Sequence, residues 1–449
     1  RRRPDGVRNR DVSLSRRSVM LSSRSAEAPQ RLPLYALLAA NTLSHIAEAI
    51  AMVAIPWFVY ELTGSYAQVG LIGFFTVLSR VIAVFFGGQL VDRIGFRTSS
   101  IASDLLSGIS VCGIPLLYAT GNLTFAWLVV LVIIGAVFDG PGATAKEAMV
   151  PELTVEAGMH LDQVNAFFQG THRLSFLIGP VIAGFLVLWI GASNVFWVNA
   201  VVFGLSALIT IALVTDVAIS RDDNESPASF WANTLFGFRF IRQHRLLVWL
   251  AGMICLMNFL DAPFATVQLP ALVRENYGSA DRVGLLLGAF GLGAVVGTAV
   301  YSAIAPRLPR RRTFIAGFFV MGLLSLLMST APPYPVLLVA FVLEGIASAP
   351  LNPITMSIRQ ERVPMQYRAR VFGTTRAIAF AAIPLGQLVA GFMIEWMGVR
   401  PFILMVSLIY LAAVVSFVFN PVLREMDQRP ATITSRSPSV QDQSAANPH

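Results

Sequence analysis

Long apolar runs separated by short polar segments recur between residues 33 and 420. The hydrocarbon core of a bilayer is about 30 Å thick and requires about 20 apolar residues per helix. Twelve runs meet this requirement, near residues 34–60, 67–91, 99–119, 123–145, 165–190, 192–215, 246–272, 282–304, 313–330, 334–356, 371–397 and 400–420. The pattern therefore predicts an all-α integral membrane protein with twelve transmembrane helices.

The composition agrees with a chain that lies mostly in lipid. Of its 449 residues, 55% are hydrophobic and only 13% are charged. A soluble protein usually contains roughly a quarter charged residues. Between the fourth and fifth runs, the segment 147–162 is more polar and is expected to lie along the inner membrane surface.

The basic residues are distributed unevenly between the two sides of the predicted bundle. The net charge is +8, with 33 Lys and Arg. If successive helices alternate in direction, 27 of these residues fall on one side, including Lys146 in the loop after the fourth helix, and three fall on the other. Cytoplasmic loops carry such an excess, so both termini are predicted to be cytoplasmic. The same distribution argues against a nucleic-acid partner.

The second half of the chain repeats features of the first, as in many membrane transporters. A shift of 207 residues aligns the Ala-Gly-Phe, Trp and Gly positions of 183–191 with those of 390–398, and a shift of 214 aligns Arg97 with Arg311. The polar segment between the halves ends in an amphipathic run. The predicted domains are a disordered basic cytoplasmic tail (1–32), an N-terminal six-helix half (33–215), a cytoplasmic linker with an amphipathic helix (216–245), a C-terminal six-helix half (246–420) and a disordered cytoplasmic tail (421–449).

A charged turn between the second and third predicted helices carries a distinctive motif, Gly-x-x-x-Asp-Arg-x-Gly-x-Arg. Its residues are Gly88, Asp92, Arg93, Gly95 and Arg97. The pattern resembles the signature loop of the major facilitator superfamily. In that superfamily the loop meets the cytoplasmic end of the eleventh helix. The resemblance therefore implies a gating motif in which Asp92 acts as a conformational latch.

The fifth predicted helix contains a second motif. Gly179, Pro180, Ala183 and Gly184 resemble the Gly-Pro-x-x-Gly-Gly motif of the superfamily's antiporters. Simple close packing is the alternative interpretation, because Pro kinks a helix and small residues let helices approach. With the segment 144–152, these motifs most resemble the Tap-like multidrug efflux group of drug:proton antiporters, whose relatives include the macrolide-efflux and enterobactin-exporter groups.

The resemblance extends over residues 33–420 and implies a fold and a function. The implied fold is two six-helix halves related by a pseudo-two-fold axis. The implied function is proton-coupled export of small molecules by alternating access, performed by a monomer in the inner membrane of a bacterium. An exporter of a siderophore or lipid-like metabolite fits as well, and an importer of a sugar or metabolite shares the fold. A non-transporting membrane receptor is an alternative from a different class.

Glu48 lies near the middle of the first predicted helix, where a charge needs a partner or a function. A carboxyl group held in the membrane can bind and release a proton during transport, as proton coupling requires. A static ion pair with Arg80 of the second helix is the structural alternative. His45 precedes Glu48 by three residues, so it lies on the same helix face and can hydrogen-bond the carboxyl group.

Further acidic residues lie within other predicted helices. Asp139, closer to the cytoplasmic end of the fourth helix, can bind a cationic substrate or relay a proton, or it can pair with Arg80 or with an arginine of the turn around Asp92. Asp261 and Glu344 lie in the seventh and tenth helices, which line the central cavity in the superfamily, so the resemblance implies a role in binding protons or substrate. Asp104, near the start of the third helix, is expected to be a gate or a structural partner.

Several functions lack the residues that they require. The sequence contains no Gly-x-x-x-x-Gly-Lys-Ser/Thr phosphate loop and no His, Cys or Glu cluster with metal-ligand spacing. An ATP-driven pump, a metal site, a cofactor and an enzymatic activity are therefore not expected, and the proton gradient is the expected energy source. The expected partners are protons, the lipid bilayer and a small molecule. Aromatic residues within the helices favour a hydrophobic or cationic cargo.

Overall fold

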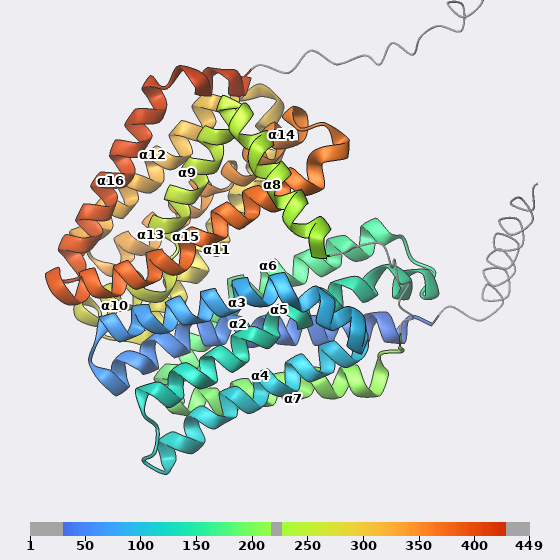
Figure 1. Cartoon of the computed structure of the whole chain (residues 1–449). Coiled ribbons are helices and arrows are strands. Elements are labelled where there is room, and N and C mark those ends of the chain that lie inside the picture. Colours follow the sequence, from blue (N-terminus) through green and yellow to red (C-terminus); the bar gives the residue numbers. More distant parts are fainter. Residues whose placement is uncertain (1–29, 217–226, 428–449) are drawn as a thin grey trace, which may run out of the picture. The chain divides into compact units, whose positions relative to one another are not determined.

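The computed structural model describes residues 30–216 and 227–427 (Figure 1). In this part of the chain, twelve helical segments are long and apolar enough to cross a membrane, and no strand is formed. The prediction of an all-α protein with twelve spans is confirmed. Most of the two predicted tails and residues 217–226 lie outside the described part of the chain.

The chain folds into two compact units. The first runs to Asp223 and includes Ala265–Gly288, and the second contains Asn224–Phe264 and the chain from Ala289 onward. The first unit holds α2 (Leu32–Thr63), α3 (Tyr66–Ile94), α4 (Phe96–Ala119), α5 (Phe125–Glu156), α6 (Leu161–Ile190), α7 (Ala192–Leu213), α10 (Leu269–Asn276) and the beginning of α11 (Ala280–Ile304). The second holds α8 (Pro227–Gln243), α9 (Arg245–Asp261), the rest of α11, α12 (Arg310–Ser329), α13 (Tyr334–Ser348), α14 (Leu351–Arg362), α15 (Arg368–Met397) and α16 (Val399–Phe419). The predicted domain boundaries remain predictions.

Two of the twelve spans are broken along their length. The seventh consists of α9, a π-helical segment η1 (Phe264–Gln268) and α10, and the tenth consists of α13 and α14. Pro263 and Pro350 lie at the breaks. Proline removes a backbone donor and clashes with the preceding turn, so it favours an interruption at each of these positions. The candidate residues Asp261 and Glu344 lie on the amino-terminal side of these breaks.

The helix α5 is longer than the fourth apolar run and continues to Glu156. Most of the segment 147–162 is therefore a continuation of this helix, not a separate surface segment. Its apolar side packs against the beginnings of α2 and α6, in a core of Leu34, Leu37, Met149, Val150, Leu153, Val164 and Phe168. The polar residues Glu147 and Glu152 lie on its exposed side. A polar stretch at the end of a span was thus mistaken for a segment on the membrane surface.

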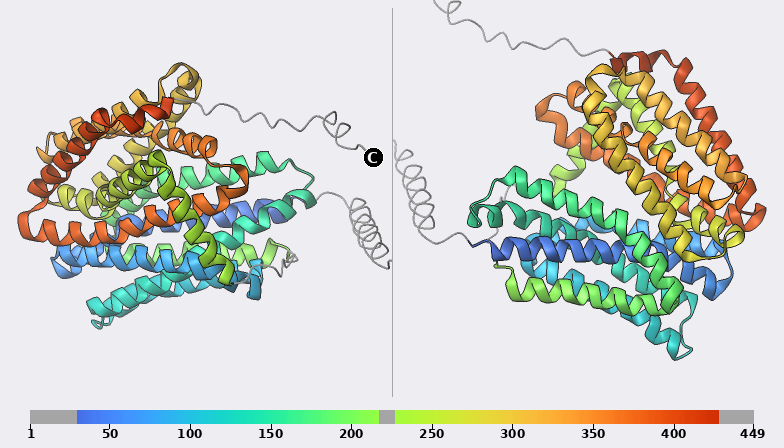
Figure 2. Two further views of the ribbon diagram at one scale, coloured as in Figure 1. Left: turned by 45° about the horizontal axis from the view of Figure 1, so that its top comes forward. Right: turned by 180° about the vertical axis from the view of Figure 1, so that it is seen from behind.

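The long helices of the first unit lie side by side (Figures 1 and 2). α2 packs against α6 and α7, α4 packs against α5 and α7, and α3 packs against α5. Small residues permit close contact, as is usual between membrane helices. Gly108 of α4, for example, faces the backbone of α7 so closely that a larger side chain would press on Phe203.

A buried ion pair joins four helices of this unit. The Nζ atom of Lys146 (α5) lies 2.9 Å from both carboxylate oxygens of Asp104 (α4), and the two side chains are 2% and 3% exposed. Lys146 also donates to Ser44 of α2, and Ser206 of α7 donates to Asp104 at 2.6 Å. The expectation that Lys146 lies in an inner loop was wrong. Asp104 is the structural partner that the sequence analysis considered.

The internal repeat is visible in corresponding turns of the two units. Gly191 separates α6 from α7 with φ of 82°, and Gly398 separates α15 from α16 with φ of 84°. Both angles lie in the left-handed region that favours glycine. Trp189 and Trp396, which precede these turns, are 74% and 76% exposed. The aligned sequence positions therefore have the same local structure.

The second alignment, of Arg97 with Arg311, also corresponds to a shared structural role. Arg97 donates to the carbonyl of Ile211 at 2.7 Å, near the end of α7, and Arg311 donates to the carbonyl of Val418 at 2.6 Å, near the end of α16. The last four carbonyls of a helix have no intrahelical partner, and a cation there is favoured by the helix dipole. Each arginine thus caps the last helix of its half.

The amphipathic run after residue 227 forms α8, which packs on α15 in the second unit. Gly237 lies against the backbone of Arg370 and the side chain of Thr374. The Phe236 ring contacts the Tyr367 ring at 4.9 Å, and the Arg370 guanidinium lies 5.5 Å above the Phe236 ring. The expected helix is present, and these contacts hold it to the second unit.

Removing one partner of the Lys146 and Asp104 pair should destabilise the protein by about 3–5 kcal/mol, because the other charge stays buried without compensation. We expect Lys146→Met and Asp104→Asn each to lower the unfolding temperature in detergent. The double variant Lys146→Met/Asp104→Leu should recover most of the loss. Glu147→Gln, a change at the exposed neighbour, is the matched control. Single variants as stable as the parent protein would contradict a role for the pair in stability.

Arg97→Ala and Arg311→Ala should each cost about 1.5–3 kcal/mol locally, the value of a hydrogen bond from a charged donor. We expect faster amide hydrogen exchange at the end of α7 in the first variant and at the end of α16 in the second. Arg93→Ala, at an exposed position in the same motif, is the control. An exchange pattern that does not distinguish the two helix ends would refute the capping role.

Candidate functional site

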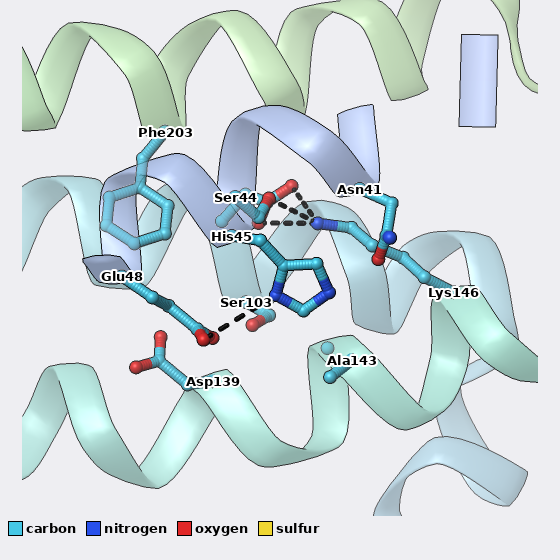
Figure 3. Close-up of a pocket in the computed structure, with 11 residues that line it drawn as sticks. Asn41, Ser44, His45, Glu48, Ser103, Asp139, Ala143, Lys146 and Phe203 are labelled. Atoms are coloured by element: carbon cyan, nitrogen blue, oxygen red, sulfur yellow. Dashed lines mark hydrogen bonds and ion pairs between the residues drawn. The ribbon is translucent and has the colours of Figure 1, made fainter. Parts of the chain in front are cut away.

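The first unit encloses a polar pocket between α2, α4, α5 and α7 (Figure 3). Its walls include Ser44, His45, Glu48, Asp104, Asp139 and Lys146. About 10 Å³ of the pocket is open to a water-sized sphere, which is room for about one water molecule. Pockets for drug-sized ligands measure about 300–1,000 Å³. The described pocket therefore suits a proton or a water molecule, not a drug.

Glu48 lies at the wall formed by α2, with a side chain that is 16% exposed. Its Oε2 atom lies 3.6 Å from Nδ1 of His45, which comes from the preceding turn of the same helix. The side chain of His45 is 10% exposed. The two groups are neighbours on one face of α2, and the distance between them is longer than that of an ordinary hydrogen bond.

Asp139 lies on α5 and faces Glu48, so the two carboxyl groups point toward one another in Figure 3. Arg80 of α3 donates to Oδ2 of Asp139 at 3.4 Å, and Ser107 of α4 donates to Oδ1 at 2.7 Å. The side chain of Asp139 is 14% exposed and that of Arg80 is 45% exposed. Arg80 is thus paired with Asp139 and not with Glu48, which decides between the two ion pairs considered from the sequence.

The charges gathered here do not balance. Asp104 is paired with Lys146 and Asp139 with Arg80, and Glu48 is the third carboxyl group of the cluster. Among the residues that the structure describes, three carboxyl groups therefore face two permanent cations, with the imidazole of His45 beside them. An uncompensated charge away from water is costly. The arrangement is closest to neutral when it holds one additional proton.

Four of the residues in this region were not identified from the sequence as parts of a site. Lys146 was counted with the loop charges, although it is the only lysine among 33 basic residues, which was the available signal. Ser44 and Ser206 carry no signal, because serine is common in membrane helices. His172 of α6 also escaped notice, and its ring meets that of His45 edge to face with centroids 4.6 Å apart.

The remaining candidate acids belong to the second unit. Asp261 is the last residue of α9 and is exposed, whereas Glu344 of α13 is 8% exposed. The two lie within electrostatic range of one another and of Tyr410. Among the described residues neither acid takes part in an ion pair. They form a separate acidic group, distinct from the group in the first unit.

The antiporter motif in α6 lies at two close helix contacts. Gly179 faces Ala49 of α2, and Gly184 faces the beginning of α11, in both cases too closely for a side chain to fit. Pro180 and Ala183 are buried. This geometry agrees with close packing, and an additional transport role of the motif remains a prediction.

The gating motif is described only in part. Gly88 and Asp92 lie in α3, and the side chain of Asp92 is not among those that the structure describes. Arg93 is exposed, Gly95 has φ of 101° between α3 and α4, and Arg97 caps α7. The latch role of Asp92 therefore remains a prediction. Among the described residues, no group of three or more His, Cys, Asp or Glu is arranged to hold a metal ion.

The chain is similar to known efflux proteins over most of its length. It is 30% identical over 401 residues to the multidrug efflux pump Tap of Mycobacterium bovis, covering 89% of this chain and 96% of the relative. It is 31% identical to the Tap pump of Mycolicibacterium fortuitum, with coverage of 89% and 98%. Identity to macrolide efflux protein A of Streptococcus pyogenes is 24% over 417 residues, with coverage of 88% and 98%.

Solved structures share the fold. The nucleoside transporter NupG superposes with a TM-score of 0.72 at 13% identity and covers 88% of this chain and 99% of its own. A bacterial homologue of the lysosomal transporter Spinster gives a TM-score of 0.69 at 15% identity, with coverage of 91% and 100%. The model of the Major Facilitator Superfamily matches residues 37–272 and 253–440. The chain therefore belongs to the Major Facilitator Superfamily and is a multi-pass membrane transporter with a small-molecule substrate.

Proposed function

We propose that the protein exports hydrophobic or cationic small molecules in exchange for protons, by alternating access of two halves. The relatives named for multidrug and macrolide efflux support export and the class of cargo. The observation that carries the proton coupling is the excess of one carboxyl group over the permanent cations in the pocket of the first unit. The proposal includes no cofactor, because the proton gradient supplies the energy.

Glu48 is the group to which we assign the exchangeable proton. The carboxylates of Asp104 and Asp139 each accept hydrogen bonds from a permanent cation, so their charges are compensated. Among the described residues, only His45 lies within ion-pair distance of Glu48. A proton taken from the outer side neutralises Glu48 and favours the return of the empty carrier. Release of this proton to the inner side restores the charge.

The cargo needs a separate place, because the pocket has room for about one water molecule. Asp261 and Glu344 of the second unit are the proposed groups for a cationic cargo or a further proton, since neither has a basic partner among the described residues. Coupling then arises because both events bias one conformational equilibrium.

The remaining features of the proposal follow from the sequence. The excess of basic residues on one side places both termini in the cytoplasm of a bacterium. The motif of Gly88, Asp92, Arg93, Gly95 and Arg97 is proposed to act in gating, and the protein is proposed to work as a monomer. A cytoplasmic position of both termini can be tested by labelling cysteines introduced into the two tails.

Glu48→Gln should abolish proton-driven export. We expect accumulation of ethidium in an efflux-deficient host to rise to the level reached with a protonophore, a loss of about 100-fold in coupled transport. Glu147→Gln, which changes an exposed carboxyl group outside the pocket, should leave export unchanged. Unchanged proton-driven export by the Glu48 variant would contradict the assignment of the exchangeable proton to Glu48. Ethidium that enters cells faster because of the protein would instead identify an importer.

The excess of one carboxyl group leads to a second prediction, which concerns the charge balance of the pocket. Asp139→Asn leaves two carboxyl groups and two cations, so the pocket should no longer require a proton and coupling should fall. Arg80→Gln combined with Asp139→Asn restores the excess of one and should recover proton binding. Proton uptake by the purified protein, measured with a pH indicator, tests both variants. If the double variant is no better than Asp139→Asn, charge balance does not govern coupling.

A further inference from the structure

We propose that His172 and His45 form a proton route between Glu48 and the surface of the first unit. The route deepens the proposed function and rests on it, because it supplies the step by which Glu48 exchanges its proton with water. His172 takes no part in the proton binding and export described above, and the route gives it a role. The side chains of Glu48, His45 and His172 contact one another in series, and they differ in exposure and in position along α2 and α6.

The contacts form a continuous series from the Glu48 carboxyl group to the surface of the first unit. Oε2 of Glu48 lies 3.6 Å from Nδ1 of His45, and the ring of His45 meets that of His172 with centroids 4.6 Å apart and planes at 83°. Glu48 and His45 come from α2, and His172 comes from α6. Nδ1 of His45 is buried and has no hydrogen-bond partner, so no strong bond holds this nitrogen in one state.

Exposure changes along the same series. The side chains of Glu48 and His45 are 16% and 10% exposed, whereas His172 is an exposed residue. His172 is thus the member in contact with the surroundings of the unit. A buried carboxyl group that exchanges protons needs such a connection, because a bare proton does not cross a packed apolar region.

The three residues also lie at increasing depth. α2 and α6 begin at the same end of the unit, since Leu34 and Leu37 share a core with Val164 and Phe168. At a rise of about 1.5 Å per residue, His172 lies about 16 Å from the start of α6, while His45 and Glu48 lie about 20 Å and 24 Å from the start of α2. The route therefore leads from Glu48 toward the end at which these helices begin.

Imidazole suits this task because it has two nitrogens that can accept and donate protons. In the release step, the Glu48 carboxyl group transfers its proton to Nδ1 of His45, which becomes an imidazolium. His45 then gives up the proton on its other nitrogen to His172, which releases a proton to water. The ring of His45 returns to its first tautomer before the next cycle, so protons and charge balance.

Charged groups lie close to both ends of the route. Arg80 and Lys146 act on Glu48, and Arg173 acts on His172, while Asp139 faces Glu48 across the pocket. A merely structural role is the alternative for His172, because its ring also packs on Phe176 with centroids 4.9 Å apart. The test must therefore measure proton movement and not stability alone.

Time-resolved infrared spectroscopy of the full chain in lipid nanodiscs follows the carboxyl stretching band after a pH jump, without any cargo. Glu48→Gln identifies the band that belongs to Glu48. We expect His172→Gln to slow the change of this band by at least about tenfold, since proton transfer by a positioned group typically contributes a factor of 100 or more. The final amplitude should stay the same, because the route affects the rate and not the equilibrium.

Two further variants separate proton transfer from packing. His172→Phe keeps an aromatic ring against Phe176 and should be as slow as His172→Gln, whereas His172→Ala should regain speed when imidazole is added to the buffer. His160→Gln, at an exposed histidine that precedes α6, is the control and should react at the normal rate.

Normal rates in the Gln and Phe variants, or a slow Ala variant that imidazole does not accelerate, would overturn the route while leaving Glu48 as the proton-binding group. The absence of any band that depends on Glu48 would overturn the proposed proton coupling, and the route with it. A slow response in the Gln and Phe variants, with recovery of the Ala variant by imidazole, supports both.

Discussion

The ion pair between Lys146 and Asp104 is the interaction on which the arrangement of the first unit depends. Ser44 and Ser206 complete its hydrogen bonds, so that α2, α4, α5 and α7 meet at one buried point. Apolar side chains give helices in lipid little reason to choose one neighbour over another, because lipid is equally apolar. A buried charge is more selective, since losing its partner costs several kcal/mol. Charge pairing therefore fixes the relative positions of these helices.

The same pairing gives the other acids of the pocket different chemical roles. Lys146 is compensated by Asp104, and Arg80 interacts with Asp139, so Glu48 lacks a permanent cation of its own. It lies instead beside His45, whose imidazole nitrogens can accept and donate protons. The fully paired charges of Lys146 and Asp104 thus lie beside Glu48, a carboxyl group in excess of the permanent cations. In the second unit, Asp261 and Glu344 lie near one another without an ion-pair partner among the described residues.

Sequence reasoning located some residues of the site and missed others for physical reasons. Glu48 stood out because an acid in the middle of an apolar run is costly and therefore requires an explanation. Lys146 did not, because it lies where the fourth run becomes polar and resembles a loop charge. The choice of Asp139 over Glu48 as the partner of Arg80 depends on how three helices are rotated about their axes. Hydropathy carries no information about that rotation.

The sequence by itself determined that the chain has twelve apolar spans and that its halves repeat, with Gly191 matching Gly398. These properties depend on the length and composition that a bilayer demands and on local turn geometry. Only the tertiary structure decided that α5 buries Lys146 and that His172 of α6 touches His45 of α2. Such contacts join segments far apart in the chain. They are set by the rotation and register of packed helices, which no single segment encodes.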